Sequence, residues 1–104
     1  MAKHHLTSAE LSRAVITVPG HVVFRSFDAD TVLLNLSSGQ YHGLNVTGGR
    51  MLELLQENGS VPVTASRVAE EFGQPLEEVT RDLLELCTEL AARCLIEVGA
   101  DRLG

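Results

Sequence analysis

The sequence predicts an α+β domain in which a three-stranded antiparallel sheet is followed by three helices. Residues 21–44 contain short runs of β-branched and aromatic residues separated by turn formers, a pattern typical of strands. Residues 45–98 instead place apolar residues at the three- and four-residue spacing of helices. The stretch from Gln40 to Gly48, with the sequence QYHGLNVTG, joins the two halves.

The composition indicates a single globular domain with an acidic surface. A chain of 104 residues is long enough for one core. Its 14 acidic and 8 basic residues give a net charge of -6, which argues against a nucleic-acid surface because such surfaces use Lys and Arg to neutralise phosphates. No apolar run approaches the roughly 20 residues of a transmembrane helix, and the N-terminus lacks the apolar stretch of a signal peptide. We therefore expect no membrane segment and a cytoplasmic location.

Three strands are expected to form a meander. The first covers residues 21–27 and the second covers residues 31–36, with a cluster of turn formers between them. A second tight turn at residues 37–39 ends in a glycine that can take positive φ. The third strand follows over residues 40–44.

The first helix is expected directly after the third strand. Asn45 or Thr47 is a good N-cap for it, and Asn58 with Gly59 is a good end. Its apolar residues are spaced to point inward together. They are Met51, Leu52, Leu54 and Leu55.

The second helix is expected after a loop over residues 57–63. Thr64 is expected to cap it, and Gly73 is expected to end it. One buried stripe at helical spacing runs along this segment. It consists of Ala65, Val68, Ala69 and Phe72.

The third helix is expected to begin at Pro75, which a first helical turn tolerates, and to continue for about five turns to Cys94. Its main apolar strip consists of Leu76, Val79, Leu83, Leu86, Leu90 and Cys94. A second strip beside it consists of Leu84, Cys87 and Ala91. A helix with two apolar strips is expected to pack against two neighbours.

The chain is expected to divide into an N-terminal extension (1–19), the domain itself (20–98) and a C-terminal tail (99–104). Within the extension, Thr7 followed by Glu10 fits a capping box for a short helix. Residues 14–18 have the composition of a strand. Residues 95–98 are expected to add a brief extended segment.

No residue pattern predicts catalysis. Cys87 and Cys94 are about 10.5 Å apart along one helix at 1.5 Å per residue, so they cannot bridge each other, and free cysteines of this kind usually fill a core. Gly48 and Gly49 open a helix without the G-x-x-x-x-G-K-[ST] pattern of a phosphate-binding loop. His42 is a lone strand residue, more often structural than ligating. We expect no enzyme activity, no cofactor and no metal.

The order of a strand followed by three helices suggests a winged helix-turn-helix, so a DNA-binding regulator is the alternative function. The third helix would then be the recognition helix, but it would carry mostly acidic side chains towards DNA phosphates. These are Glu77, Glu78, Asp82, Glu85 and Glu89, offset by Arg81 and Arg93. The charge of this helix argues against major-groove binding.

Several motifs carry a likeness to a known family. They are HVVF, TVLLNL, GQYHGLNVTG, VTASRVAEEFG and PLEEVTRDLLELCTELAARCLIE. In their order and spacing, over about residues 19–98, the sequence resembles the PqqD-like family of RiPP recognition elements, which bind the leader segments of ribosomally made, modified peptides. Y-x-G-L-N, a T-G helix start and a D-L-L-x-L third helix are most similar to the stand-alone leader-recognition proteins of lasso-peptide biosynthesis.

This resemblance implies a winged helix-turn-helix scaffold without an active site. It implies that a leader peptide adds as an antiparallel strand beside the third strand and lies against the third helix. A separate leader-cleaving cysteine protease is the implied partner, with a cyclase acting later. An edge strand suits this mode because its unpaired N–H and C=O groups are available to a peptide. A heterodimerisation module that binds a folded partner through the same edge is a further alternative.

The resemblance also implies which residues bind the peptide. Main-chain pairing is expected at Gln40, Tyr41, His42 and Gly43. Side-chain contact is expected from Val79, Asp82, Leu83 and Leu86. Asp82 either pairs with a basic leader residue or joins a local network, and Leu44 is expected to anchor the core.

Overall fold

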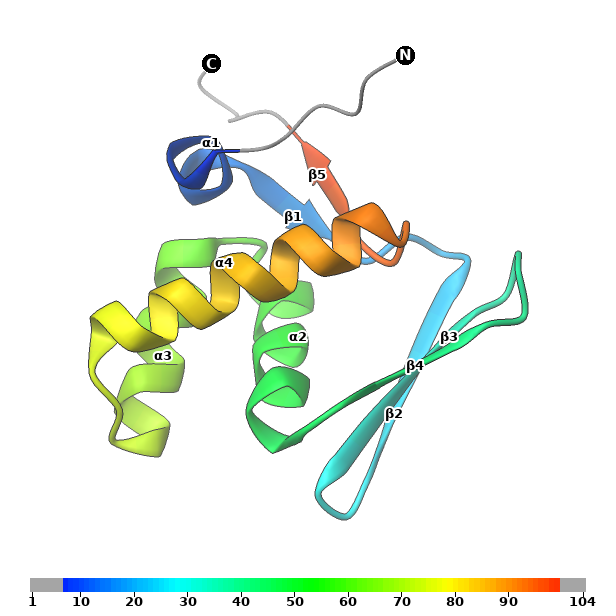
Figure 1. The fold of residues 1–104 in the computed structure, drawn as a ribbon, viewed down its shortest axis with the longest axis horizontal. Helices are drawn as coiled ribbons and strands as arrows, with labels where there is room; N and C mark the ends of the chain where they lie inside the picture. The colour runs from blue at the N-terminus through cyan, green and yellow to red at the C-terminus, as the bar shows by residue number, and fades with distance from the viewer. Residues whose placement is uncertain (1–6, 100–104) are drawn as a thin grey trace.

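The computed structural model describes residues 7–99 and has the expected α+β class. A three-stranded antiparallel sheet of order β2-β3-β4 stands to one side of a helical layer in which α4 crosses α2 and α3 (Figure 1). A second, two-stranded sheet pairs β1 with β5. In chain order the elements are α1 (Ser8–Arg13), β1 (Val15–Thr17), β2 (Val22–Phe27), β3 (Asp30–Asn35), β4 (Tyr41–Leu44), α2 (Val46–Asn58), α3 (Val61–Phe72), α4 (Leu76–Ala92) and β5 (Glu97–Gly99).

The expected meander of β2, β3 and β4 is confirmed, and its register is regular. Leu33 of β3 pairs with Phe24 of β2 and with His42 of β4. Leu33 is fully buried, so this row of the sheet faces the helices. Gly39 takes a φ of 76° in the second turn, as expected for the residue that reverses the chain there.

The core lies between the sheet, the helices and the β1-β5 pair. The apolar residues expected to point inward from the first of the three predicted helices, which is α2, are all buried. Asn45 caps this helix by accepting a hydrogen bond from the Gly48 N–H, and Gly59 ends it with a φ of 70°. The buried apolar residues are Leu11, Ile16, Val22, Leu33, Met51, Leu52, Leu54, Leu55, Val61, Ala65, Val68, Val79, Leu83, Cys87, Leu90, Leu95 and Ile96.

α3, the second of the three expected helices, begins at Val61 and so earlier than expected. The prediction of a loop over 57–63 with Thr64 as N-cap is therefore wrong. Ser60 is the N-cap and accepts a hydrogen bond from the Val63 N–H. Pro62 lies in the first turn, where its missing N–H costs nothing. Thr64 is buried inside the helix and donates its hydroxyl to Oδ1 of Asn58.

α4, the third of the three expected helices, ends before Cys94. The prediction that Cys94 continues its apolar strip is therefore wrong. Cys94 is exposed and has a φ of 60°, a left-handed conformation that stops the helix. Its N–H donates to the Ala91 carbonyl, and the Leu95 N–H donates to the Leu90 carbonyl, which together form a Schellman motif. Leu76, at the other end of the same predicted strip, is also exposed.

The N-terminal segment is part of the core. Thr7 and Glu10 form the expected capping box at the start of α1. The expected strand is present as β1, which pairs with β5. Leu11 and Ile16 are each 1% exposed, so α1 and β1 pack on the body of the protein. The domain limits of 20–98 stay a prediction.

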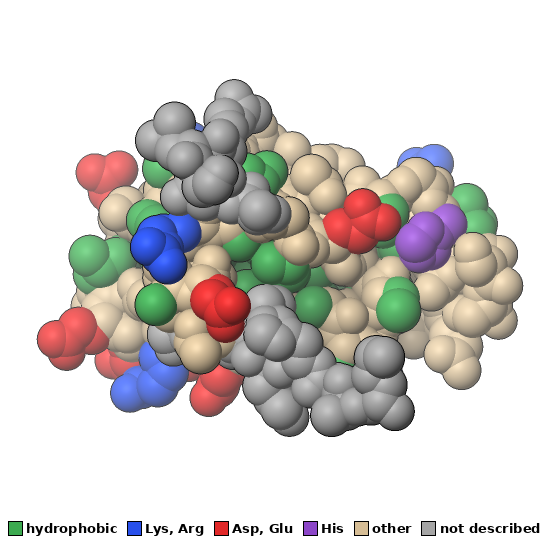
Figure 2. Space-filling model, turned by 90° about the horizontal axis from the view of Figure 1, so that it is seen from above, with side chains coloured by type: hydrophobic (Ala, Val, Ile, Leu, Met, Phe, Trp, Pro, Cys, Tyr) green, Lys and Arg blue, Asp and Glu red, His purple; other side chains and the backbone are tan. Residues whose placement is uncertain are grey.

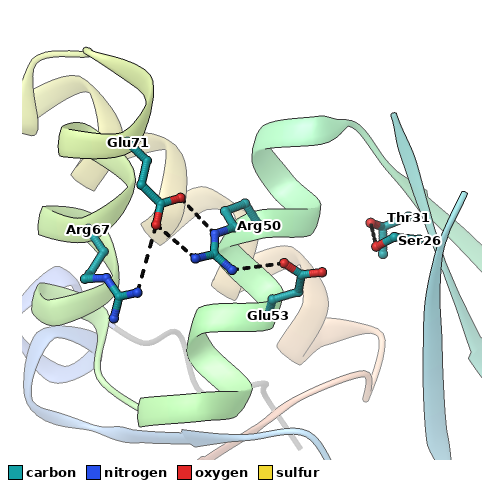
Figure 3. A network of polar contacts seen from close by, with 6 residues as sticks. All are labelled: Ser26, Thr31, Arg50, Glu53, Arg67 and Glu71. Carbon is teal, nitrogen blue, oxygen red and sulfur yellow. Dashed lines mark hydrogen bonds and ion pairs between the residues drawn. The ribbon is translucent and has the colours of Figure 1, made fainter. Parts of the chain in front are cut away.

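A close approach between α2 and β3 fixes the position of the sheet. Gly49 packs directly against Thr31 of β3, and a Cβ added at Gly49 would overlap the Thr31 hydroxyl oxygen and lie 2.9 Å from its Cβ. The Thr31 hydroxyl also shares a 2.9 Å hydrogen bond with the Ser26 hydroxyl of β2 (Figure 3). Only glycine therefore allows α2 to start so close to the sheet.

An ion-pair network joins α2 to α3. The Arg50 guanidinium donates to both carboxylate oxygens of Glu71, at 2.8 and 2.9 Å, and to Glu53 of its own helix at 3.2 Å (Figure 3). Arg67 lies 4.0 Å from the same Glu71 carboxylate. The hydrogen bonds from Arg50 lower the pKa of Glu71, because they favour its charged form.

We predict that Gly49→Ala destabilises the fold by about 1–3 kcal/mol, the usual cost of forcing extra atoms into a packed site. The urea midpoint, measured by circular dichroism, should fall while the slope of the transition stays unchanged. Gly20→Ala is the matched control, because a Cβ at Gly20 meets nothing within 4 Å. Equal midpoints for the two variants would contradict the close approach.

We also predict that Glu71→Gln loses stability at neutral pH but not in acid. The pKa of Glu71 is lower in the folded protein than in the unfolded chain, so its contribution is present above the unfolded pKa and is lost as pH falls through the folded pKa. The difference in unfolding free energy between wild type and variant should therefore shrink towards zero in acid. A difference that is constant with pH would argue against the ion pair with Arg50.

Candidate functional site

β4 is an edge strand of the three-stranded sheet, and half of its backbone faces away from the sheet. The Asn35 N–H donates to the Gln40 carbonyl, which makes this a hydrogen-bonded pair, and such pairs recur at every second residue of an antiparallel ladder. Leu33 with His42 is then the next hydrogen-bonded pair. It follows that the N–H and C=O groups of Tyr41 and Gly43 point outward, to the open side of β4.

This register divides the four residues expected to pair with a peptide backbone. Tyr41 and Gly43 offer both backbone groups at the edge. The carbonyl of Gln40 is used by Asn35, and the backbone of His42 faces β3. The main-chain role expected of the four residues stays a prediction, and Tyr41 and Gly43 are the two whose backbone groups both face the open edge. The partly buried side chain of His42 lies on the helix side of the sheet instead.

A groove of about 420 Å³ runs between β4 and α4. One wall is β4 with the first turn of α2, and the other wall is one face of α4. Buried Met51 and partly buried Leu44 and Leu86 give it apolar surface. The lining residues are His42, Gly43, Leu44, Asn45, Thr47, Gly48, Met51, Asp82, Glu85, Leu86 and Glu89.

The groove carries a negative charge. Asp82, Glu85 and Glu89 lie on the face of α4 that borders it, and no Lys or Arg is among its lining residues. Nε2 of His42 lies 3.7 Å from the Glu89 carboxylate and so links the two walls. Arg93, one turn beyond Glu89, lies 3.8 Å from the same carboxylate.

The structure places the four expected helix residues in different surroundings. Asp82 and Leu86 line the groove. Leu83 is fully buried in the core. Val79 is 4% exposed and borders an adjoining cavity of about 220 Å³ near the start of α2. Their role in binding stays a prediction.

Two groove residues were missed at the level of sequence. Glu85 and Glu89 both line the groove beside Leu86, although neither belongs to the expected peptide-binding set. Their spacing of three and four residues from Asp82 and Glu85 does predict a shared helix face. The sequence alone does not tell which neighbour that face borders.

Within residues 7–99 the structure groups no side chains for catalysis. Burial raises the pKa of the Cys87 thiol to about 12, so this thiol is protonated and hidden at neutral pH. Among these described residues, no three His, Cys, Asp or Glu side chains gather as metal ligands. A second hollow, of about 610 Å³, lies along α4 against Leu11, and Glu85 and Glu89 line both this hollow and the groove.

The described surface also lacks the positive charge of a DNA-binding protein. On the face shown in Figure 2, basic side chains lie scattered among acidic ones and form no continuous basic patch. α4 exposes Glu77, Glu78, Asp82 and Glu85. Phosphate binding would bring like charges together along this helix.

Comparison with known proteins identifies the family. The profile of Coenzyme PQQ synthesis protein D (PqqD) matches residues 30–96, which include β3, β4 and all three long helices. The chain belongs to the PqqD family. The resemblance drawn from the sequence motifs is therefore confirmed.

Two solved structures share the fold of this PqqD-family protein. TbiB1 in complex with the TbiA(beta) leader peptide is 31% identical, with a TM-score of 0.72 over 78% of this chain and 94% of TbiB1. A lasso peptide synthetase B1 complexed with the leader peptide has a TM-score of 0.73 at 24% identity, over 81% of this chain and 99% of its own, and it supports the fold alone. Among curated proteins, none matches this sequence. None of the helices in residues 7–99 has the length and apolar character needed to cross a membrane.

We predict that backbone amides of β4 alternate in hydrogen exchange. The amides of Tyr41 and Gly43 should exchange rapidly, because they face the open edge, whereas the His42 amide should be at least about tenfold slower, because it pairs with Leu33. Heteronuclear NMR of the free protein after transfer into D₂O measures this. Slow exchange at Tyr41 and Gly43 would mean a different register or an occupied edge.

Proposed function

We propose that this protein binds the leader segment of a ribosomally made precursor peptide and has no catalytic activity of its own. The leader adds as an antiparallel strand to the open edge of β4 and lies in the groove against α4. The observation that carries the proposal is the coincidence of an outward-facing backbone at Tyr41 and Gly43 with a groove along the same strand. Membership of the PqqD family, and 31% identity to a protein solved with a leader peptide, support it.

The free-energy balance suits this mode of binding. Each main-chain hydrogen bond adds about 0.5–1.5 kcal/mol net, and Tyr41 and Gly43 each offer one donor and one acceptor. These bonds recognise any extended peptide, so they give affinity without much selectivity. Selectivity then depends on the leader side chains that enter the groove, where Leu44, Met51 and Leu86 offer apolar surface.

The proposal includes the partners implied by a leader-binding role in lasso-peptide biosynthesis. The protein presents the bound leader to a separate leader-cleaving cysteine protease, and a cyclase acts on the released segment. We place this work in the cytosol, because a ribosomally made precursor first appears there. Sedimentation of the protein with the protease, with and without precursor, tests the partnership.

The DNA-binding alternative rests on the order of the strands and helices alone. The charge of α4 opposes it, and the groove-facing side of that helix is acidic as well. A heterodimerisation module would use the same edge of β4 but would not bind an isolated leader. Comparing the isolated leader peptide with the whole protease as ligands separates leader binding from heterodimerisation with a folded partner.

We predict that Tyr41→Pro weakens leader binding at least about tenfold, because proline removes the outward N–H. The fold itself should survive, because edge strands tolerate proline. Isothermal titration with the cognate leader peptide measures the change. The pairing of β3 with β4 should survive, because the lost N–H does not face β3. An unchanged circular dichroism spectrum would verify this.

Tyr41→Ala is the matched control for that variant. It removes the exposed side chain and keeps the outward N–H, so we expect affinity within about threefold of wild type. His42→Pro should instead destabilise the protein, because its N–H belongs to the ladder with Leu33. Full affinity in Tyr41→Pro, or no wild-type binding at high micromolar concentration, would contradict the proposed function.

A further inference from the structure

The charges of the groove are unevenly compensated. Glu89 already has His42 at 3.7 Å and Arg93 at 3.8 Å as partners for its carboxylate. In the part of the chain that the structure describes, neither Glu85 nor Asp82 forms an ion pair. Asp82 lies near the first turn of α2, whose positive dipole end favours a carboxylate. The least compensated charge is therefore that of Glu85, midway along the groove.

A strand added to β4 would cover this charge. Both Glu85 and the open edge border the same groove, so a bound peptide removes water from the carboxylate. Burying a carboxylate without a partner is costly, and the cost falls when a cation accompanies it. A Lys or Arg side chain of the peptide itself brings such a cation into the groove.

The pleat of β4 tells where that cation lies. In an added strand, side chains alternate between the groove and the outer face of the sheet. The two leader residues opposite Leu44 and His42 share the groove side with those two partly buried residues. The position opposite Leu44 meets apolar surface from Met51 and Leu86, whereas the position opposite His42 lies beside the Glu89 carboxylate.

We propose that the leader carries a Lys or Arg at the groove-facing position opposite His42, where it pairs with Glu85 and Glu89. An apolar residue two positions away faces Leu44, Met51 and Leu86. This inference rests on the proposed function, because it assigns the side-chain chemistry of the peptide bound at that site. α4 then selects the leader by charge as well as by apolar contact, and β4 supplies affinity through its backbone.

Fluorescence anisotropy with a fluorescein-labelled synthetic peptide of the cognate leader tests the inference. The double variant Glu85→Gln/Glu89→Gln should bind about tenfold more weakly than wild type at low salt, the loss typical of a charge-assisted contact. Its affinity should also depend less on salt concentration than that of wild type, because screening has fewer charges to act on.

The matched control is Glu70→Gln/Glu77→Gln. It makes the same change in net charge at exposed positions of α3 and α4 that lie outside the groove. We expect its affinity to stay within about twofold of wild type. Equal losses in the two double variants would mean that net charge, and not the groove, attracts the peptide, and would overturn the inference.

The peptide gives the reciprocal test. Each Lys or Arg of the leader is replaced in turn by Gln. One of these replacements should lower the affinity for the wild-type protein about tenfold but change the affinity for Glu85→Gln/Glu89→Gln little. Such non-additivity is what a direct pair between the two side chains produces. If wild type binds the leader and no replacement has this effect, the inference fails and the proposed function stands. If wild type does not bind the leader at all, the proposed function fails first.

Discussion

The close approach of α2 to β3 at Gly49 determines the shape of the rest of the molecule. Because no side chain separates Gly49 from Thr31, the start of α2 lies directly on the sheet. β4 enters that helix through the Asn45 cap without a connecting loop, so its position follows from the same contact. α4 packs across α2 and α3, and the space left between α4 and β4 is the groove. A packing constraint in the core thus sets the geometry of the surface where a peptide is proposed to bind.

The two walls of the groove contribute differently to the proposed binding of a peptide. β4 presents backbone groups at Tyr41 and Gly43, and substitutions there that preserve an extended backbone leave those groups in place. α4 presents side chains, and in the proposed mode of binding these side chains select the peptide. On the proposed function, substitutions on the groove side of α4 change the preferred leader, whereas the fold depends on the buried side of the same helix at Leu83 and Cys87.

Local sequence signals predicted the fold well, and tertiary placement accounts for the errors. Asn45 and Gly59 act through their own backbone and near neighbours, so the limits of α2 followed from the sequence. Thr64 was expected to cap α3, but Ser60 is also a good N-cap and Pro62 suits the first helical turn that follows it. Periodicity placed Leu83 and Leu86 in one apolar strip, but only the packed structure shows that Leu83 enters the core and Leu86 the groove. The outward direction of Tyr41 required the register with β3, which no local pattern contains.

In the proposed complex, a leader peptide occupies the open edge of β4. Isotope-filtered NMR of labelled protein with unlabelled cognate leader measures it most directly, through intermolecular contacts between backbone protons. We expect such contacts at Tyr41 and Gly43 in the alternating pattern of an antiparallel pair, together with contacts from leader side chains to Leu86. A saturated complex that shows contacts elsewhere on the protein and none along β4 would contradict it.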